Sequence, residues 1–171
     1  MKRINLTSLR TSRLAGRFRM NRRNFLFAAG AAVVTVSAFE LFSTTEGRGG
    51  ENRPDPLTQN SPLLKAIAFG VHAPNPHNTQ AWAFKVLSER KFLLYIDETR
   101  ILPVTDPTTR QIHIGCGAFL EALAIGVSSV GLTAIIDLFP EGVSRGMPIA
   151  AVELVEFPAT PHALASLITQ R

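Results

Sequence analysis

Cysteine is nearly absent from this sequence of 171 residues, which contains only Cys116. A single cysteine cannot form an internal disulfide, so the fold must be stabilised by its apolar core alone. It also cannot supply a Cys-x-x-Cys metal or redox motif. Two interpretations of Cys116 remain, a buried small apolar side chain and a reactive thiol, and we favour the first.

Other signatures of common enzyme classes are missing as well. The sequence has no Gly-x-Ser-x-Gly turn, which argues against a Ser-His-Asp hydrolase triad. It also has no glycine-rich loop ahead of a helix, which argues against a nucleotide-phosphate site. The four histidines are His72, His77, His113 and His162. No two of them stand at i and i+4 of one expected helix, so a metal site is poorly supported. Asp97, Glu98 and Asp106 lie near expected turns and are interpreted as solvated loop carboxylates.

Acidic residues are absent from the first 23 positions, which hold eight of the 18 lysines and arginines. Without this segment the chain has 10 basic and 13 acidic side chains, so the formal charge of +5 belongs to the N-terminus. The remaining residues therefore offer no phosphate-tracking surface, and a nucleic-acid-binding protein is not indicated.

The basic segment is followed by an uncharged apolar run over residues 25–39, which ends before Glu40. Arg22-Arg23 ahead of Phe25 resembles a twin-arginine export signal, so residues 1–42 are predicted to be a signal segment. At 15 residues the run is shorter than the roughly 20 needed to cross a bilayer, although an uncleaved anchor stays an alternative. Val36-Ser37-Ala38 offers small residues at which a signal peptidase could cleave. No cysteine lies near the leader, so a lipid attached to an N-terminal cysteine is not expected. We expect export to the periplasm or cell envelope.

Residues 43–60 are polar and broken by glycine and proline, so they are predicted to be a flexible linker before one domain at 61–171. Ser61-Pro62 is typical of a helix start, and apolar spacing extends that helix to about His72. A hairpin follows over 82–96, then a long helix over 108–131. The inward residues of the long helix are expected to be Ile112, Cys116, Phe119, Leu120, Leu123, Ala124 and Val127.

Two more strands are expected at 134–139 and 149–157, and a last helix over 162–170. This order predicts an α+β fold with helices packed on a mixed or antiparallel sheet. Gly115, Gly117 and Gly126 lie within the long helix, where each costs roughly 1 kcal/mol against alanine. They indicate either close packing against another backbone or ligand, or a weakly specified helix.

The loop before the hairpin reads Ala73-Pro74-Asn75-Pro76-His77-Asn78-Thr79-Gln80-Ala81-Trp82. Asparagine and glutamine carry both donors and an acceptor, which suits the edge of a planar heteroaromatic ligand such as a flavin. Flanking prolines would hold the amides still and reduce the entropy lost on binding. The alternative is a polar loop that only ends a helix and starts a strand, and the residues alone do not separate the two.

This loop, continued by Ala83-Phe84, resembles the Ala-Pro-Ser-x-x-Asn-x-Gln-Pro-Trp-x-Phe segment of the nitroreductase family, in its Acg-like branch. Arg100-Ile101-Leu102, Asp106-Pro107-Thr108-Thr109-Arg110 and Ile114-Gly115-Cys116-Gly117-Ala118 are similar to further elements of that branch, in the same order. The similarity spans about residues 63–132. It implies a nitroreductase-like fold that holds FMN non-covalently, commonly at a dimer interface, and that takes electrons from a nicotinamide donor.

By this resemblance Asn78 and Gln80 fall at positions that hydrogen-bond the flavin. Asn75 stands where the family usually has serine; its amide can still donate and accept, so the resemblance implies it as a further cofactor-binding residue. Ala81 replaces the usual proline. Arg110 is implied to pair either with the FMN phosphate or with Asp106. Trp82 and Phe84 begin the strand beneath the flavin, where a core role is favoured.

Members of that branch continue well beyond the end of this chain, so the resemblance implies an N-terminal part of the fold. The function expected is an exported FMN-binding oxidoreductase in which the flavin carries the hydride chemistry. No catalytic side chain can be named. The alternatives are a flavin-binding or flavin-storing protein without turnover and an inactive structural fragment.

Overall fold

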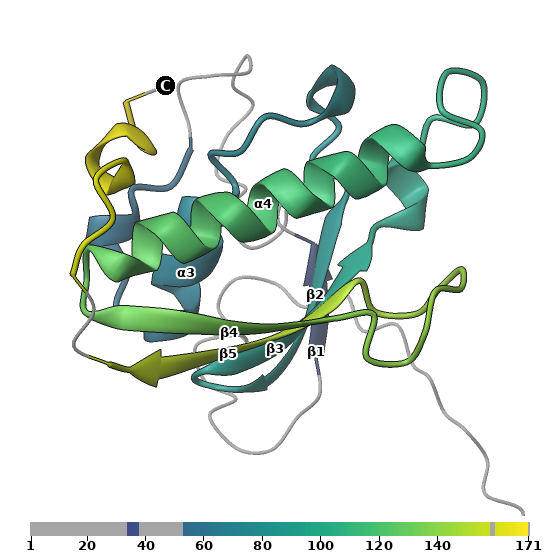
Figure 1. Ribbon diagram of the computed structural model, residues 1–171. Helices are drawn as coiled ribbons and strands as arrows, with labels where there is room; N and C mark the ends of the chain where they lie inside the picture. Colours follow the sequence, from purple (N-terminus) through teal and green to yellow (C-terminus); the bar gives the residue numbers. More distant parts are fainter. Residues whose placement is uncertain (1–33, 38–52, 158–159, 171) are drawn as a thin grey trace, which may run out of the picture.

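The computed structural model describes residues 34–37, 53–157 and 160–170, and within them helices cover one face of an antiparallel sheet (Figure 1). The sheet has five strands in the order β1-β2-β3-β5-β4, and all of its pairs are antiparallel. The predicted α+β class is therefore confirmed. The rest of the predicted signal segment and residues 43–52 of the predicted linker lie outside the described residues.

The first described helix, α3 (Pro62–Gly70), begins as its sequence predicts. The Ser61 hydroxyl accepts a hydrogen bond from the Leu64 amide at 3.1 Å, and proline occupies the first helical position, where no amide donor is needed. The helix ends two residues before the predicted His72. Its buried face includes Leu63, Ile67 and Phe69.

Two hairpins build the described sheet beside the short strand β1 (Val34–Ser37). The first joins β2 (Trp82–Ser88) to β3 (Lys91–Ile96), with Phe84 opposite Leu94. The second joins β4 (Leu132–Leu138) to β5 (Ala150–Glu156), and β5 pairs with β3. Within β2 and β5 buried and more exposed residues alternate, because one face packs on helices. All four strands predicted from sequence are present.

The long helix α4 (Arg110–Ser128) lies across the sheet and beside α3 (Figure 1). Its Phe119 ring lies 5.1 Å from the Trp82 ring and 5.5 Å from the Phe84 ring, measured between centroids. These three side chains are fully buried and join the helix to β2. Of the predicted inward residues only Ala124 is not fully buried; Ala122 is buried instead.

The last predicted helix is wrong. Residues 162–170 contain one 3-10 turn, η4 (Ala165–Leu167), in place of a helix. Ala165 is its only buried residue, and Leu164 and Leu167 are about half exposed. An isolated helix of this length is marginal, because nucleation costs more than a short run of hydrogen bonds returns. Without a packed apolar stripe, the segment keeps only a turn.

The C-terminal part of the predicted linker, residues 53–60, packs against α3. It contains the 3-10 turn η1 (Pro56–Thr58), in which Pro56 is buried. The Arg53 guanidinium donates to the His72 carbonyl at 2.8 Å, and His72 Nε2 lies 3.3 Å from the Pro54 carbonyl oxygen. His72 is buried, and its Nδ1 has no hydrogen-bond partner among the described residues.

This environment predicts a loss of stability in acid. Burial lowers the pKa of His72 from its usual value of about 6.5, against a smaller raising effect of the bond to Pro54. The unfolded chain therefore binds a proton at this residue more readily than the folded chain. We expect the free energy of unfolding to be full above about pH 6.5 and to fall as the pH is lowered below it.

Urea denaturation between pH 7.5 and pH 5 checks this expectation. His72→Gln should flatten that part of the pH dependence, whereas His77→Asn, which replaces an exposed imidazole, should keep it. A slope that survives unchanged in His72→Gln would contradict the assignment.

Candidate functional site

The loop between α3 and β2 is held in an unusual backbone conformation. It contains the 3-10 turn η2 (Pro76–Asn78), and His77, Asn78 and Gln80 have positive φ angles of 48°, 53° and 46°. Left-handed backbone costs roughly 1–2 kcal/mol at a residue other than glycine, and such outliers are commonly found at functional sites. Other contacts must therefore stabilise this loop.

Asn75 supplies one of those contacts from within the loop. Its side-chain oxygen accepts a hydrogen bond from the Gln80 amide at 2.8 Å, and its Nδ2 donates to the Ala73 carbonyl at 3.4 Å. The side chain thus closes the loop on itself. Asn75, which is longer than the family's serine, therefore positions the loop. Its role as a cofactor ligand stays a prediction.

The side chains of Asn78 and Gln80 lie next to each other in this loop. Gln80 Nε2 donates to Asn78 Oδ1 at 3.4 Å, and Asn78 is exposed while Gln80 is half-buried. Among the described residues, Asn78 Nδ2 and Gln80 Oε1 have no hydrogen-bond partner. The pair therefore presents an amide donor and an amide acceptor side by side, which is the pattern a heteroaromatic edge requires.

Arg100 is a positioning residue that sequence reasoning missed. Its guanidinium donates to the Thr79 carbonyl at 3.0 Å and lies 3.6 Å from the Asp97 carboxylate. Asp97 itself follows β3 and donates its amide to the Ala81 carbonyl at 3.0 Å. Arg100, at the end of the hairpin, thus stabilises the loop although it lies 21 residues after Thr79 in the sequence. The expectation of a merely solvated Asp97 is corrected, because its carboxylate pairs with Arg100.

Gly115 of α4 lets the loop lie directly on the helix. A Cβ atom at this position would stand 3.0 Å from the Pro76 ring and 3.5 Å from Asn75 Cβ. Gly126 is tighter still, with Phe69 atoms 2.2 Å from the position of a Cβ. Of the two alternatives, close packing holds at Gly115, against the loop, and at Gly126, against the Phe69 side chain, whereas nothing lies within 4 Å of a Cβ at Gly117.

Arg110 and Asp106 do not form an ion pair in the described part of the chain. Arg110 is exposed at the first position of α4. Asp106 is only 4% exposed, and its carboxylate accepts a hydrogen bond from the Ile112 amide at 3.1 Å. Asp106 is therefore a buried helix cap and not a solvated carboxylate, and the cationic group of Arg110 stays accessible near the start of α4.

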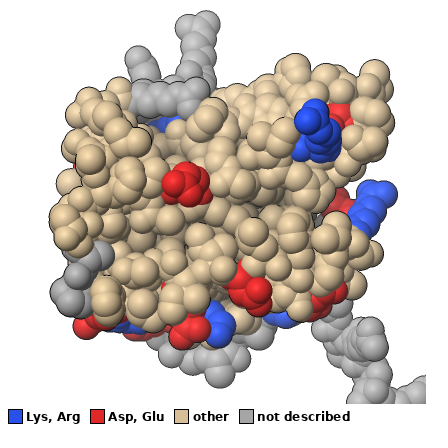
Figure 2. Space-filling view, in the orientation of Figure 1, with Lys and Arg blue, Asp and Glu red and all other residues tan. Residues whose placement is uncertain are grey.

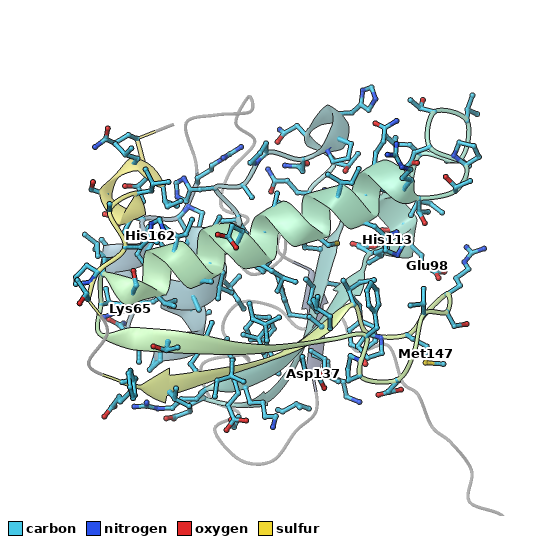
Figure 3. The ribbon with its side chains drawn as sticks, in the orientation of Figure 1. Lys65, Glu98, His113, Asp137, Met147 and His162 are labelled. Atoms are coloured by element: carbon cyan, nitrogen blue, oxygen red, sulfur yellow. The ribbon has the colours of Figure 1, made fainter. Side chains whose placement is uncertain are left out.

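The surface around the loop is otherwise nearly uncharged. Figure 2 shows isolated acidic and basic side chains on a broad neutral face over α4. His113 and His162 lie toward opposite ends of that helix (Figure 3), and no group of metal-binding side chains exists among the described residues. A neutral amide-bearing surface suits the uncharged ring of a heteroaromatic ligand.

The remaining candidates are structural. Trp82 and Phe84 are buried in the core with Phe119, which confirms their predicted core role. Cys116 is fully buried, and burial raises the pKa of its thiol to about 12. At neutral pH the thiol is protonated and unreactive, so the interpretation as a small apolar side chain is confirmed.

No model of a known protein family matches this chain, but several proteins of Mycobacterium tuberculosis (strain ATCC 25618 / H37Rv) are similar to part of it. "Putative NAD(P)H nitroreductase acg" is 30% identical over 87 residues, which are 51% of this chain and 26% of that protein. "Putative NAD(P)H nitroreductase Rv3131" is 30% identical over 105 residues, 61% of this chain and 30% of that protein. The similarity supports the predicted relationship to nitroreductases over about half of the chain. The matched segments span less than a third of these relatives.

Proposed function

We propose that this chain is the N-terminal part of an exported, FMN-binding oxidoreductase of the nitroreductase type. The observation that carries the proposal is the adjacent donor and acceptor of Asn78 and Gln80, on a loop whose shape other residues maintain. The similarity to proteins named as nitroreductases supports it independently. The twin-arginine-like leader supports the export part, with the twin-arginine machinery as a transient partner.

The described residues fit the chemistry of a flavin. The pyrimidine edge of the ring offers carbonyl oxygens and an N–H group, which match the free Asn78 Nδ2 donor and Gln80 Oε1 acceptor. Thr79 Oγ1 is buried beside them without a hydrogen-bond partner in the described part of the chain. When bound, the flavin would supply the hydride chemistry, and these residues would hold and orient its ring.

The loop is ordered before any ligand binds, because Asn75, Arg100 and Gly115 hold it. The entropy that would otherwise be lost on fixing the amides has been lost during folding, so binding is favoured. Arg110 is proposed to pair with the FMN phosphate. An exposed pair of this kind contributes up to about 1 kcal/mol.

Titration of FMN fluorescence with the full chain tests the site. We expect saturable quenching, and Asn78→Ala and Gln80→Ala should each weaken binding by about 0.5–1.5 kcal/mol, or about 2- to 13-fold, because each removes a neutral hydrogen bond. Asn60→Ala, which truncates an exposed amide elsewhere, is the matched control. A folded chain that does not quench FMN, or full affinity in both loop variants, would contradict the proposal.

Riboflavin separates the phosphate contact from the ring contacts. Arg110→Gln should weaken FMN and leave riboflavin affinity unchanged, whereas the two loop variants should weaken both ligands. Reduction of the bound flavin by NADH or NADPH then distinguishes an oxidoreductase from a flavin-storing protein.

A further inference from the structure

Strand β1 has an unexpected origin, because Val34–Ser37 lies inside the apolar run of the predicted leader. In the structure these four residues form an edge strand of the sheet, next to β2 (Figure 1). Val34 lies opposite Val86, and Val36 lies opposite Phe84. Residues 34–37 thus lie within the predicted export signal and also form a strand of the folded sheet.

The β2–β3 register shows which backbone groups of β2 face β1. Asp97 donates its amide to the Ala81 carbonyl, and positions 81 and 97 continue the register in which Trp82 faces Ile96. Hydrogen-bonded and non-hydrogen-bonded pairs alternate in an antiparallel ladder. The amides of Ala83 and Lys85 therefore point to β3.

The backbone groups of Phe84 and Val86 consequently point away from β3, to the side where β1 lies. Without β1 these N–H and C=O groups would form an open strand edge, which is a template for pairing with another strand. Ser88, with its register shift at the end of β2, gives little protection to the centre of this edge. A further strand must therefore pair with this side of β2 to satisfy these backbone groups.

The same apolar run cannot pair with β2 and insert into a membrane at once. In a bilayer the backbone of a single segment satisfies its own polar groups as a helix, whereas in β1 these groups pair with β2. Eight basic residues precede the run without an acidic one, and such a segment is attracted to anionic lipid. Two places therefore compete for residues 34–37.

We propose that the outer side of β2 is a docking surface for the chain's own residues 34–37, and that docking there excludes insertion of the apolar run into a membrane. The docking half of the proposal stands on the strand register alone. The membrane half rests on the leader proposed above. Departure of the leader opens the edge of β2 at Phe84 and Val86.

Amide hydrogen exchange measured by NMR on the full chain tests the docking half. Val36→Pro removes the amide that faces Phe84, and proline cannot donate to the ladder. We expect exchange at Phe84 and Val86 to rise at least about tenfold, with Ala83 and Lys85 unchanged. Ser37→Pro is the matched control, because the backbone of Ser37 lies opposite Ala83 and points away from β2.

Unchanged exchange at Phe84 and Val86 in Val36→Pro would overturn the docking half. An equal rise at all four amides would overturn it too, because β1 would then be inseparable from the fold of the whole sheet.

Vesicles of phosphatidylcholine with phosphatidylglycerol test the membrane half on the unaltered chain. Bound vesicles should accelerate exchange at Phe84 and Val86 and leave Ala83 and Lys85 protected. Vesicles that bind the chain without this change would overturn mutual exclusion. FMN is absent from both experiments, so their outcome is independent of the flavin site.

Discussion

Replacing Phe119 by alanine is expected to lower the free energy of unfolding by about 3–5 kcal/mol. The ring is fully buried and contacts both Trp82 and Phe84. It also lies against Gly70 of α3, where ring atoms stand 2.4 Å from the position a Cβ would take. Truncation therefore removes the side chain that joins α3, α4 and β2, and leaves a cavity among all three.

Urea denaturation of the full chain, followed by circular dichroism, measures this loss. Ile114→Ala is the control on the same helix, because Ile114 is 59% exposed and its truncation should change stability by less than about 1 kcal/mol. Equal effects of the two substitutions would show that α4 does not pack on the sheet through Phe119. Since domains are commonly stable by only about 5–15 kcal/mol, Phe119→Ala should also reduce the folded population at 37 °C.

The second large effect is expected at Gly126, where alanine should destabilise the protein by about 1–3 kcal/mol. Its Cβ would lie 2.2 Å from Phe69 Cγ, and Phe69 is buried with only 2% exposure. Either the ring or the helix must shift, and this cost exceeds the roughly 1 kcal/mol that alanine contributes to helix propensity.

Gly117→Ala is the matched control for that prediction, since nothing lies within 4 Å of its Cβ position. At this exposed site the propensity effect acts alone, so stability should rise by up to about 1 kcal/mol. Opposite signs for the two glycines, measured as shifts in the urea midpoint, would confirm the close approach of α3 and α4. A stabilising effect at both would contradict it.

The positions of most helices and strands followed from local patterns. Ser61-Pro62 marked the start of α3 because a hydroxyl cap and a missing amide donor are local properties. The alternating apolar residues Trp82, Phe84 and Val86 marked β2, because a strand places every second side chain on the same face. The segment over 162–170 failed because its pattern is compatible with a helix, yet helix stability depends on packing that the folded chain does not provide there.

The candidate site was only partly visible in the sequence. Asn78 and Gln80 were singled out by their chemistry, and the structure places their side chains together. Arg100 carried no local sign of its contact with Thr79, because the two residues are 21 positions apart. Asp106 was expected at the surface, since nothing in its turn showed that the fold would bury it as a cap.

By itself, the sequence determined the α+β class, the order along the chain of four of the five described strands, and the amide-rich loop. These depend on periodicity, caps and side-chain chemistry, which act over a few residues. The tertiary structure alone decided which glycines face a neighbour, which arginine holds the loop and that Val34–Ser37 covers the edge of β2. Such contacts join distant residues, and their partners are set by how the elements pack.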